Sequence, residues 1–358
     1  MKKIYRYLLA GLLFCSLGAP KTAAQEVVWD ASFDFFFDNR EYKSQFNWPQ
    51  TLFGMRFAPG IGIRWQEKHS FMGGINLLAN FGNKPFEDTN EMFMYYNYNS
   101  ERFKGWAGIV PRRNLIGEYP SAFFSDSIKY YHPNLAGLLL QYIGGKGFVE
   151  FGADWNSMIS KTKREKFILF SAGRLNIAPK KLFYAGYHLS MYHHAGREHN
   201  EEDGVVDNVL LHPHIGTDLS AVTPFDLFSL QVGWLGSFQN DRKYVGEYVS
   251  PGGVQIELKL EKWKFGVFNT LYLGDNLMPY FVGDPDLDYG PGLYWGDPFY
   301  RTTNDIYDRL EIYWQPLNSD MFKLRVSSVH HYDGKKWGWQ QKVIFSVALG
   351  QRRMFPKR

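Results

Sequence analysis

The sequence predicts an all-β protein, a transmembrane antiparallel β-barrel of about 16 strands with short periplasmic turns and longer outer loops. Three observations predict this fold. Apolar and polar residues alternate in segments long enough to cross a bilayer, short and long connections alternate between those segments, and an export signal precedes the first of them. A bilayer requires strands of about 9–11 tilted residues, and several of the segments exceed that length.

The alternation is clearest in residues 254–262, VQIELKLEK. In a helix the aliphatic residues would spread around the whole circumference, whereas in a strand they share one face and the polar residues share the other. Beyond residue 24 no run of about 18 apolar residues occurs, which excludes membrane-spanning helices. The same period of two predicts strands at about 27–38, 52–66, 69–81, 90–98, 102–111, 134–143, 147–157, 165–175, 181–194, 208–221, 225–238, 253–262, 264–274, 305–315, 321–332 and 338–350.

The connections separate a membrane barrel from a soluble sandwich. Counted from a periplasmic N-terminus, the even-numbered connections are tight, such as SERF, GGKG and TPF, and the odd-numbered ones include the long segments 112–133 and 275–304. Short periplasmic turns and longer outer loops are typical of outer-membrane barrels. The sheet must close because an unpaired backbone group in hydrocarbon costs several kcal/mol.

The N-terminus predicts export. Lys2, Lys3 and Arg6 precede the apolar residues 8–17, and small residues at 22–24 suit a cleavage before Gln25. Residues 1–24 therefore read as a signal peptide, and residues 25–358 as the barrel domain. An uncleaved anchor is the alternative, but the apolar segment is short for one.

Composition excludes several classes of function. Four of the 40 Lys and Arg residues lie in residues 1–24, which hold no Asp or Glu, so the remainder balances 36 basic against 36 acidic residues. The overall pI of about 8.8 thus gives no reason to expect nucleic acid as a partner. Cys15, the one cysteine, lies in the leader, which excludes disulfides and cysteine-ligated metal from the exported chain.

Over residues 25–358 this pattern of strands and connections resembles the porin-like barrels of Gram-negative outer membranes. The resemblance is one of architecture, and the end of the chain departs from it, because Phe355 is followed by three further residues instead of ending the last strand. It implies a location in the outer membrane, contact with its lipid, and passive diffusion of small hydrophilic solutes without a cofactor. It also allows a homotrimer, since many porins associate through an apolar wall.

The third outer loop, 112–133, resembles in position the loop that general porins fold inward to narrow the pore, so we expect it to fold into the lumen. By this interpretation its charged residues set the aperture: Arg112, Arg113, Glu118, Asp126 and Lys129. Charged wall residues of both signs would face the lumen, where charged side chains set ion preference: Asp154, Asp218, Glu257, Lys259, Glu261, Arg309, Lys323, Arg325 and Lys342. The alternative interpretations are a surface loop packed on the rim, and wall residues that are simply hydrated or paired.

Two other groups are weaker candidates. His212 and His214, two apart on one strand face with Asp218 beyond them, are a candidate metal site, although lumenal histidines need no ligand to be satisfied. Loop 275–304 contains a D-x-D-x-D stretch and aromatic residues that suit sugar stacking, or else form the loop's own cluster. We therefore consider Asp284, Asp286, Asp288, Tyr294 and Trp295 as candidate loop-binding residues. The glycine spacing does not fit a calcium loop.

No catalytic motif is recognisable, so the sequence favours a protein that is not an enzyme. Two rival functions remain open: a surface barrel that recognises a glycan or a partner protein through its loops, and an outer-membrane hydrolase. The hydrolase alternative depends on two groups that share strand faces, His188 with Ser190, and His214 with Asp218 and Ser220. Adjacent His330 and His331 point to opposite faces, which argues against a joint role.

Overall fold

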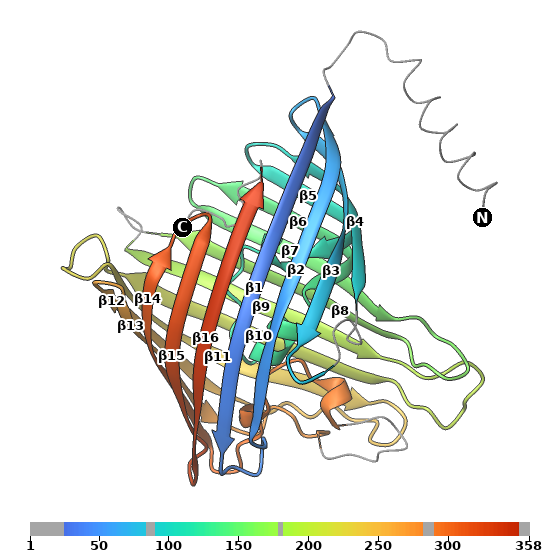
Figure 1. Ribbon diagram of the computed structural model, residues 1–358. Coiled ribbons are helices and arrows are strands. Elements are labelled where there is room, and N and C mark those ends of the chain that lie inside the picture. The colour runs from blue at the N-terminus through green and yellow to red at the C-terminus, as the bar shows by residue number, and fades with distance from the viewer. Residues whose placement is uncertain (1–24, 84–89, 178–181, 282–289, 351–358) are drawn as a thin grey trace.

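A computed structural model describes residues 25–83, 90–177, 182–281 and 290–350. Sixteen antiparallel strands form a closed barrel in which each strand pairs with its neighbours in sequence and β1 pairs with β16 (Figure 1). The strands are β1 Glu26–Tyr42, β2 Gln50–Trp65, β3 His69–Asn80, β4 Glu91–Asn99, β5 Phe103–Pro111, β6 Asn134–Gly144, β7 Gly147–Ser157, β8 Lys166–Asn176, β9 Phe183–His194, β10 Val206–Asp218, β11 Leu227–Asp241, β12 Gly252–Lys262, β13 Phe265–Gly274, β14 Ile306–Asn318, β15 Phe322–Tyr332 and β16 Trp337–Gly350.

The predicted fold class is confirmed, and the predicted strands match the observed ones closely. The largest difference is at β1, which runs on to Tyr42 instead of ending near residue 38, so the first outer loop shortens to residues 43–49. Pro59 stays inside β2 because it lies where the pairing of β2 with β3 is interrupted, and there its missing N–H costs no ladder bond. The expected signal peptide, residues 1–24, lies outside the described residues.

Short and long connections lie at opposite ends of the barrel. The short ones, such as 66–68, 145–146 and 263–264, lie at the end where β1 begins, and segment 112–133 and the described residues of 275–305 lie at the other (Figure 1). In an outer-membrane barrel the first end is periplasmic and the second faces outward. Among the described residues, no helix is long and apolar enough to span a membrane.

The two faces of the wall differ as the period of two requires. In β12, Val254 faces outward and is 43% exposed, whereas Gln255 faces inward and is fully buried. Large apolar side chains cover the outer face around the barrel, among them Trp29, Phe57, Ile61, Met92, Val149, Trp155, Ile215 and Ile312. Lipid takes the place of a protein core for this face, so the exposed apolar residues are the membrane contact.

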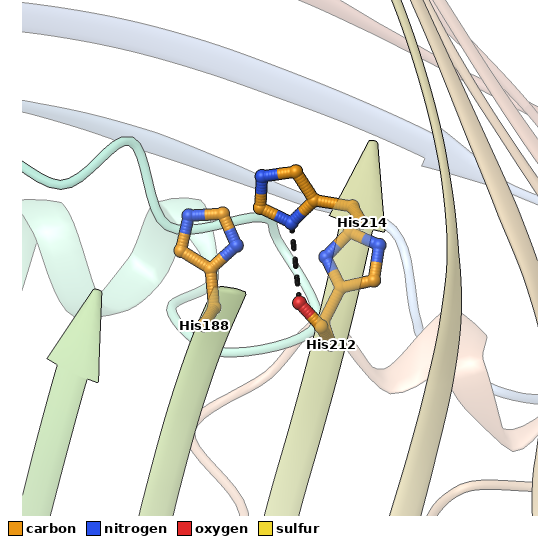
Figure 2. Close-up of side chains that lie close together, drawn as sticks. All are labelled: His188, His212 and His214. Carbon is orange, nitrogen blue, oxygen red and sulfur yellow. Dashed lines mark hydrogen bonds between the residues drawn. The ribbon is translucent and has the colours of Figure 1, made fainter. Parts of the chain in front are cut away.

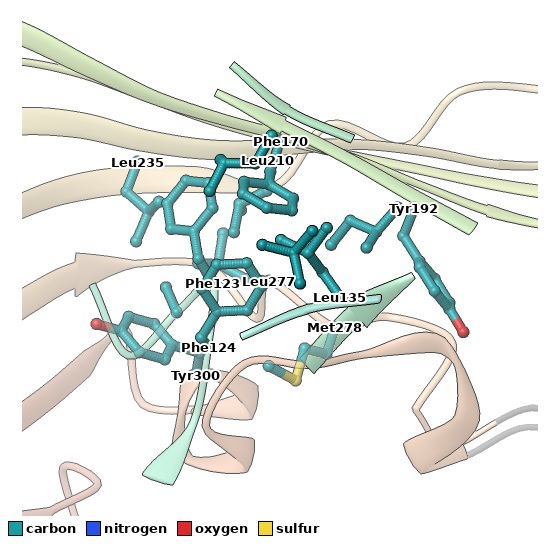
Figure 3. Close-up of a cluster of buried hydrophobic side chains, with 14 of the residues drawn as sticks. Phe123, Phe124, Leu135, Phe170, Tyr192, Leu210, Leu235, Leu277, Met278 and Tyr300 are labelled. Carbon is teal, nitrogen blue, oxygen red and sulfur yellow. The ribbon is translucent and has the colours of Figure 1, made fainter. Parts of the chain in front are cut away.

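The outer half of the lumen holds a hydrophobic core of its own. Loop 112–133, with the 3-10 helix η1 (Arg112–Asn114) and the helix α2 (Asp126–Tyr131), lies inside the barrel beside the end of loop 275–305, which carries η4 (Gly290–Leu293) and η5 (Pro298–Arg301). Phe123, Phe124 and Tyr300 pack there against wall residues such as Phe170 and Leu210 (Figure 3). The Ser125 amide also donates to the Trp295 carbonyl at 2.8 Å, so the two loops support each other.

Loop 112–133 is attached to opposite walls of the barrel. On one side the amides of Ile116 and Gly117 donate to Glu150 of β7 at 2.8 and 3.1 Å. On the other side Asp126 accepts from Lys342 of β16 at 3.0 Å. Because the loop spans the lumen between these two attachments, it acts as an internal brace.

The charges around Asp126 fix its protonation state. Burial alone would raise the pKa of Asp126, but Lys342, Lys129 and Arg309 outweigh burial and hold that pKa well below the ordinary 3.8. Arg309 lies 3.6 Å from the same carboxylate. A carboxyl whose pKa is lowered by folding stabilises the protein fully above its ordinary pKa and loses that contribution as the pH falls below it.

We expect Asp126→Asn to reduce the free energy of unfolding by about 3 kcal/mol at neutral pH, because it leaves buried cations without their partner. Tryptic cleavage after Lys129 should also become faster. Unfolding in urea, followed by tryptophan fluorescence in detergent micelles, measures the first effect, and Glu67→Gln in an exposed turn is the control. The two stabilities should converge as the pH falls below about 4. Equal stability at neutral pH would contradict the brace.

Candidate functional site

A serine and a histidine lie at hydrogen-bonding distance on the lipid-facing side of β15. Ser328 Oγ and His330 Nε2 are 3.0 Å apart. The two residues are separated by one position, so both point to the same face, away from the lumen, whereas Val329 between them and Ser327 and His331 on either side are buried inside. A paired hydroxyl and imidazole is the arrangement that activates a nucleophile.

Further polar side chains continue the pair across the outer wall. Ser328 is paired in register with Gln341 of β16, Gln341 with Asn39 of β1, and Asn39 with Thr51 of β2. Asn39 Nδ2 donates to Gln341 Oε1 at 2.8 Å, and Thr51 Oγ1 donates to Asn39 Oδ1 at 2.8 Å. A row of polar residues therefore crosses four strands, with hydrogen bonds from Gln341 to Thr51, on a face where an apolar residue is the rule.

Two carboxylates flank His330 on the same face. Asp308 of β14 is paired with Tyr332, which places it diagonally from His330, and it accepts from Asn269 of β13 at 2.7 Å. Diagonal neighbours in a sheet lie about 7–8 Å apart, within reach of a side-chain rotation. Glu41 of β1 lies two strands from His330, about 10 Å away, because strands are spaced by about 4.8 Å. Asp308 is thus the better placed of the two to orient the imidazole.

Aromatic residues set the depth of this polar patch in the membrane. Tyr332 and Trp337 pack at a centroid distance of 4.7 Å beside it, and Trp339 lies between His330 and Glu41 in the register. Aromatic rings of this kind mark the boundary between headgroups and acyl chains. Because these strand ends adjoin the outer loops, the patch lies at the level where the acyl chains of outer-leaflet lipids join their headgroups.

The polar patch, which we define as Asn39, Glu41, Thr51, Asn269, Asp308, Ser328, His330 and Gln341, contains the groups that ester hydrolysis needs. Ser328 offers a hydroxyl group with an imidazole base at hydrogen-bonding distance. The amide of Gln341, on the register partner of Ser328, is a donor for a developing oxyanion. The approach is open to lipid and not to the lumen.

The lumenal residues expected from the sequence do face inward. A cavity of about 670 Å³ lies between loop 112–133 and the wall, and ten of them line it: Arg112, Arg113, Glu118, Asp126, Lys129, Glu257, Lys259, Arg309, Arg325 and Lys342. Most are paired, for example Lys259 with Glu118 at 2.6 Å and Arg325 with Glu311 at 3.1 Å. The other four share the inward face away from the cavity. Among them Asp154 pairs with Arg112, Asp218 lies 4.0 Å from Arg174, and Glu261 accepts from Tyr313 at 2.9 Å, whereas Lys323 lies at the periplasmic end of β15.

The expected loop-binding residues are not gathered on a surface. Asp284, Asp286 and Asp288 lie outside the described residues. Tyr294 and Trp295 pack inside the barrel, where Tyr294 donates to Gln239 at 2.6 Å and the Trp295 ring lies against Arg112 at 4.9 Å. Both aromatic rings therefore belong to the internal hydrophobic core. This agrees with the alternative that the aromatic residues of the loop form a cluster of their own instead of binding a sugar.

The expected histidine pair gains a different third member. His212 and His214 lie with His188 of β9, and possible ligand atoms of the three lie within 4.8 Å of one another. Asp218 accepts from Ser220 Oγ at 2.7 Å, whereas His214 Nδ1 lies 3.2 Å from the carbonyl oxygen of His212, so His214 is directed to a different partner. Ser190 lies at the apolar contact between loops 112–133 and 275–305, sealed from the membrane.

Sequence reasoning missed the polar patch. Pairing histidines with serines by strand face does not show which face meets lipid. A signal was available: once the alternation assigns Val326 to lipid, Ser328 and His330 follow on that same face. Polar residues on the lipid side are expensive, so each one found there calls for a functional explanation.

The closed barrel and its apolar outer wall define an integral outer-membrane protein. Within that class the chain belongs to the lipid A 3'-O-deacylase-type family, whose sequence model matches residues 21–343. A search of curated proteins finds no significant match.

Solved structures agree on the fold. The chain is similar to Pseudomonas aeruginosa OccK5 (OpdH), with a TM-score of 0.51, 10% identity, and coverage of 91% of this chain and 99% of the other. It is also similar to Pseudomonas aeruginosa OpdO, with a TM-score of 0.52, 10% identity, and coverage of 91% and 98%. At this identity the likeness concerns the barrel alone.

Two expectations from the sequence are wrong. The porin function, with its aperture set by loop 112–133 and its small hydrophilic solutes, is overturned because the family is one of deacylases. The expectation that the protein is not an enzyme falls for the same reason, and the hydrolase alternative agrees with the family. Both errors have the same cause: the number of strands and the alternation of short and long connections indicate the fold but not the function of the barrel.

Proposed function

We propose that this protein hydrolyses an ester-linked acyl chain of lipid A at the polar patch on its lipid-facing wall. The observation that carries the proposal is the Ser328–His330 pair, 3.0 Å apart on the membrane side of β15. Membership of the lipid A 3'-O-deacylase-type family supports the choice of substrate and of bond. A lipid substrate needs a site that opens to the bilayer, and this pair opens to it.

The proposed reaction proceeds through an acyl-enzyme. Ser328 Oγ attacks the ester carbonyl carbon while its proton passes to His330 Nε2. The bond from that carbon to the sugar oxygen then breaks, and His330 returns the proton to the departing hydroxyl. Water, deprotonated by His330, hydrolyses the acyl-serine and releases the fatty acid.

The neighbouring polar residues have supporting roles in this proposal. The Gln341 side-chain amide stabilises the negative charge on the carbonyl oxygen, and Asn39 holds Gln341 through the 2.8 Å hydrogen bond to its carbonyl oxygen. That bond orients the amide so that its N–H groups face away from Asn39. Asp308 steadies the imidazolium that forms when His330 takes the proton.

The outer rim beside the patch suits a phosphorylated glycolipid. Lys43 follows β1 and lies 5.8 Å from the Trp339 ring, and Lys335 and Lys336 occupy the turn between β15 and β16. These three cations lie just outside the aromatic boundary, where anionic headgroups attract basic residues. A lipid held by its headgroup at this rim places its acyl esters at the level of the patch.

We expect Ser328→Ala and His330→Ala each to reduce the rate of lipid A deacylation on the order of 10³-fold or more, because either change removes the activated nucleophile. The assay incubates purified protein with lipid A in mixed micelles and follows the loss of one acyl chain by mass spectrometry.

Ser327→Ala is the matched control, since Ser327 precedes Ser328 in the chain but faces the lumen. Ser190→Ala tests the lumenal pair of His188 and Ser190 in the same assay. Full activity of Ser328→Ala, or a loss confined to Ser190→Ala, would contradict the lipid-facing site.

Asp308→Asn should lower kcat on the order of 10²–10⁴-fold with little change in KM, because Asp308 acts on the transition state through His330. Asp308→Glu should restore part of the rate, which a merely structural role would not do. Glu41→Gln serves for comparison and should leave the rate nearly unchanged, given its greater distance from His330. A larger loss in Glu41→Gln than in Asp308→Asn would reverse the assignment.

A further inference from the structure

Three histidines meet inside the barrel, on the lumenal side of β9 and β10 (Figure 2). His188 and His212 are paired in register, and His214 is paired with Gly186. The ring centroids of His188 and His212 both lie 5.0 Å from that of His214. All three side chains are buried.

The nitrogen atoms of this cluster lack partners that burial would normally demand. Within the part of the chain that the structure describes, neither ring nitrogen of His212, nor Nδ1 of His188, has a hydrogen-bond partner. A buried polar atom without a partner destabilises the folded state, so three in one cluster call for an explanation. A metal ion that accepts a lone pair from His188 Nδ1 and from one ring nitrogen of His212 would satisfy two of these three atoms.

His214 and His188 each place one ring nitrogen against a backbone group, as metal-binding histidines commonly do. His214 Nδ1 lies 3.2 Å from the carbonyl oxygen of His212, so a proton on Nδ1 leaves the lone pair on Nε2 (Figure 2). His188 makes a hydrogen bond to the backbone of Glu118, which leaves its Nδ1 for a ligand. Backbone carbonyls that fix the tautomer are the usual second partners of ligating histidines.

Glycines make the space that the imidazole rings occupy. A Cβ at Gly186 would come within 2.5 Å of His214 Nε2, and one at Gly233 of β11 within 2.8 Å of His212 Nε2. Both glycines face inward beside the histidines, at positions where any side chain would fill the cluster.

We propose that His188, His212 and His214 bind a divalent transition-metal ion of the zinc class inside the barrel. Three neutral imidazoles match the nitrogen donors that zinc, copper and nickel prefer, whereas calcium and magnesium prefer oxygen. Zinc coordinated by three histidines keeps a fourth position for water. The site is separate from the polar patch, which lies on the other face of the wall.

The bound ion would connect the wall to the internal brace. His188 packs against Tyr119 and Phe123 of loop 112–133, with centroid distances of 5.5 and 5.8 Å, besides its hydrogen bond to Glu118. An ion that fixes His188 therefore also fixes the surface on which the loop rests. The ion stabilises the folded barrel, because the unfolded chain holds no preformed site.

The test is metal binding by the purified, EDTA-stripped protein in detergent. We expect isothermal titration with ZnCl₂ to show one ion per chain, and Co²⁺ to give the intense visible absorption of a four-coordinate nitrogen site. His212→Ala should weaken binding by at least about 100-fold. Zinc should raise the Tm of the wild type and leave that of His212→Ala unchanged.

His193→Ala is the matched control, because His193 lies on β9 but faces outward beside Asp207, and it should bind like the wild type. Gly186→Ala is a second variant that keeps every histidine but crowds His214 Nε2, and it should also lose binding. Heat-modified migration on gels verifies that each variant is folded. Equal binding by the wild type and folded His212→Ala, or no stoichiometric binding by the wild type, would overturn the proposal. Neither readout uses lipid A, so either proposal can fail alone.

Discussion

Everything in this structure depends on one constraint: a backbone in hydrocarbon must find all its hydrogen-bond partners within the protein. Closure through the pairing of β1 with β16 satisfies it and leaves the sheet without an edge. Closure also gives every residue of a strand one of two environments, lipid or lumen. Outward strand residues are therefore apolar as a rule, and a polar residue on the outer face needs a functional explanation.

The polar patch is such an exception. Elsewhere the outward positions of β14 and β15 carry residues such as Ile312, Trp314 and Val326, and the change to Asp308, Ser328 and His330 occurs near the outer ends of the strands. The free-energy cost of polar side chains on the lipid-facing wall is lowest near these strand ends, because water reaches the headgroup boundary. The acyl esters of the outer-leaflet lipids lie at the same boundary. The position of the substrate and the cost of polar side chains in the membrane therefore both favour this depth for the polar patch.

Much of the fold could be predicted from the sequence because strand alternation, strand length and the parity of connections are local properties. The pattern in 254–262 required no tertiary information. The site depends on which residues become neighbours across strands, and Ser328 meets Gln341 and Asn39 only through a register that joins the two ends of the chain. His188 likewise joins His212 through pairing, which sequence spacing does not reveal. The inward fold of loop 112–133 is expected from its position in the chain, but its contacts with Glu150 and Lys342 are not, because those residues lie on walls far away in sequence.

The internal brace has a consequence for the cell that makes this protein. An open cylinder of this circumference would let nutrients and toxins alike cross the outer membrane. Here aromatic side chains from the braced loops, Phe123, Phe124 and Tyr300 among them, fill much of the outer half of the lumen. Under the proposed function lipid A is processed on the exterior of the wall, so the reaction does not require an open lumen.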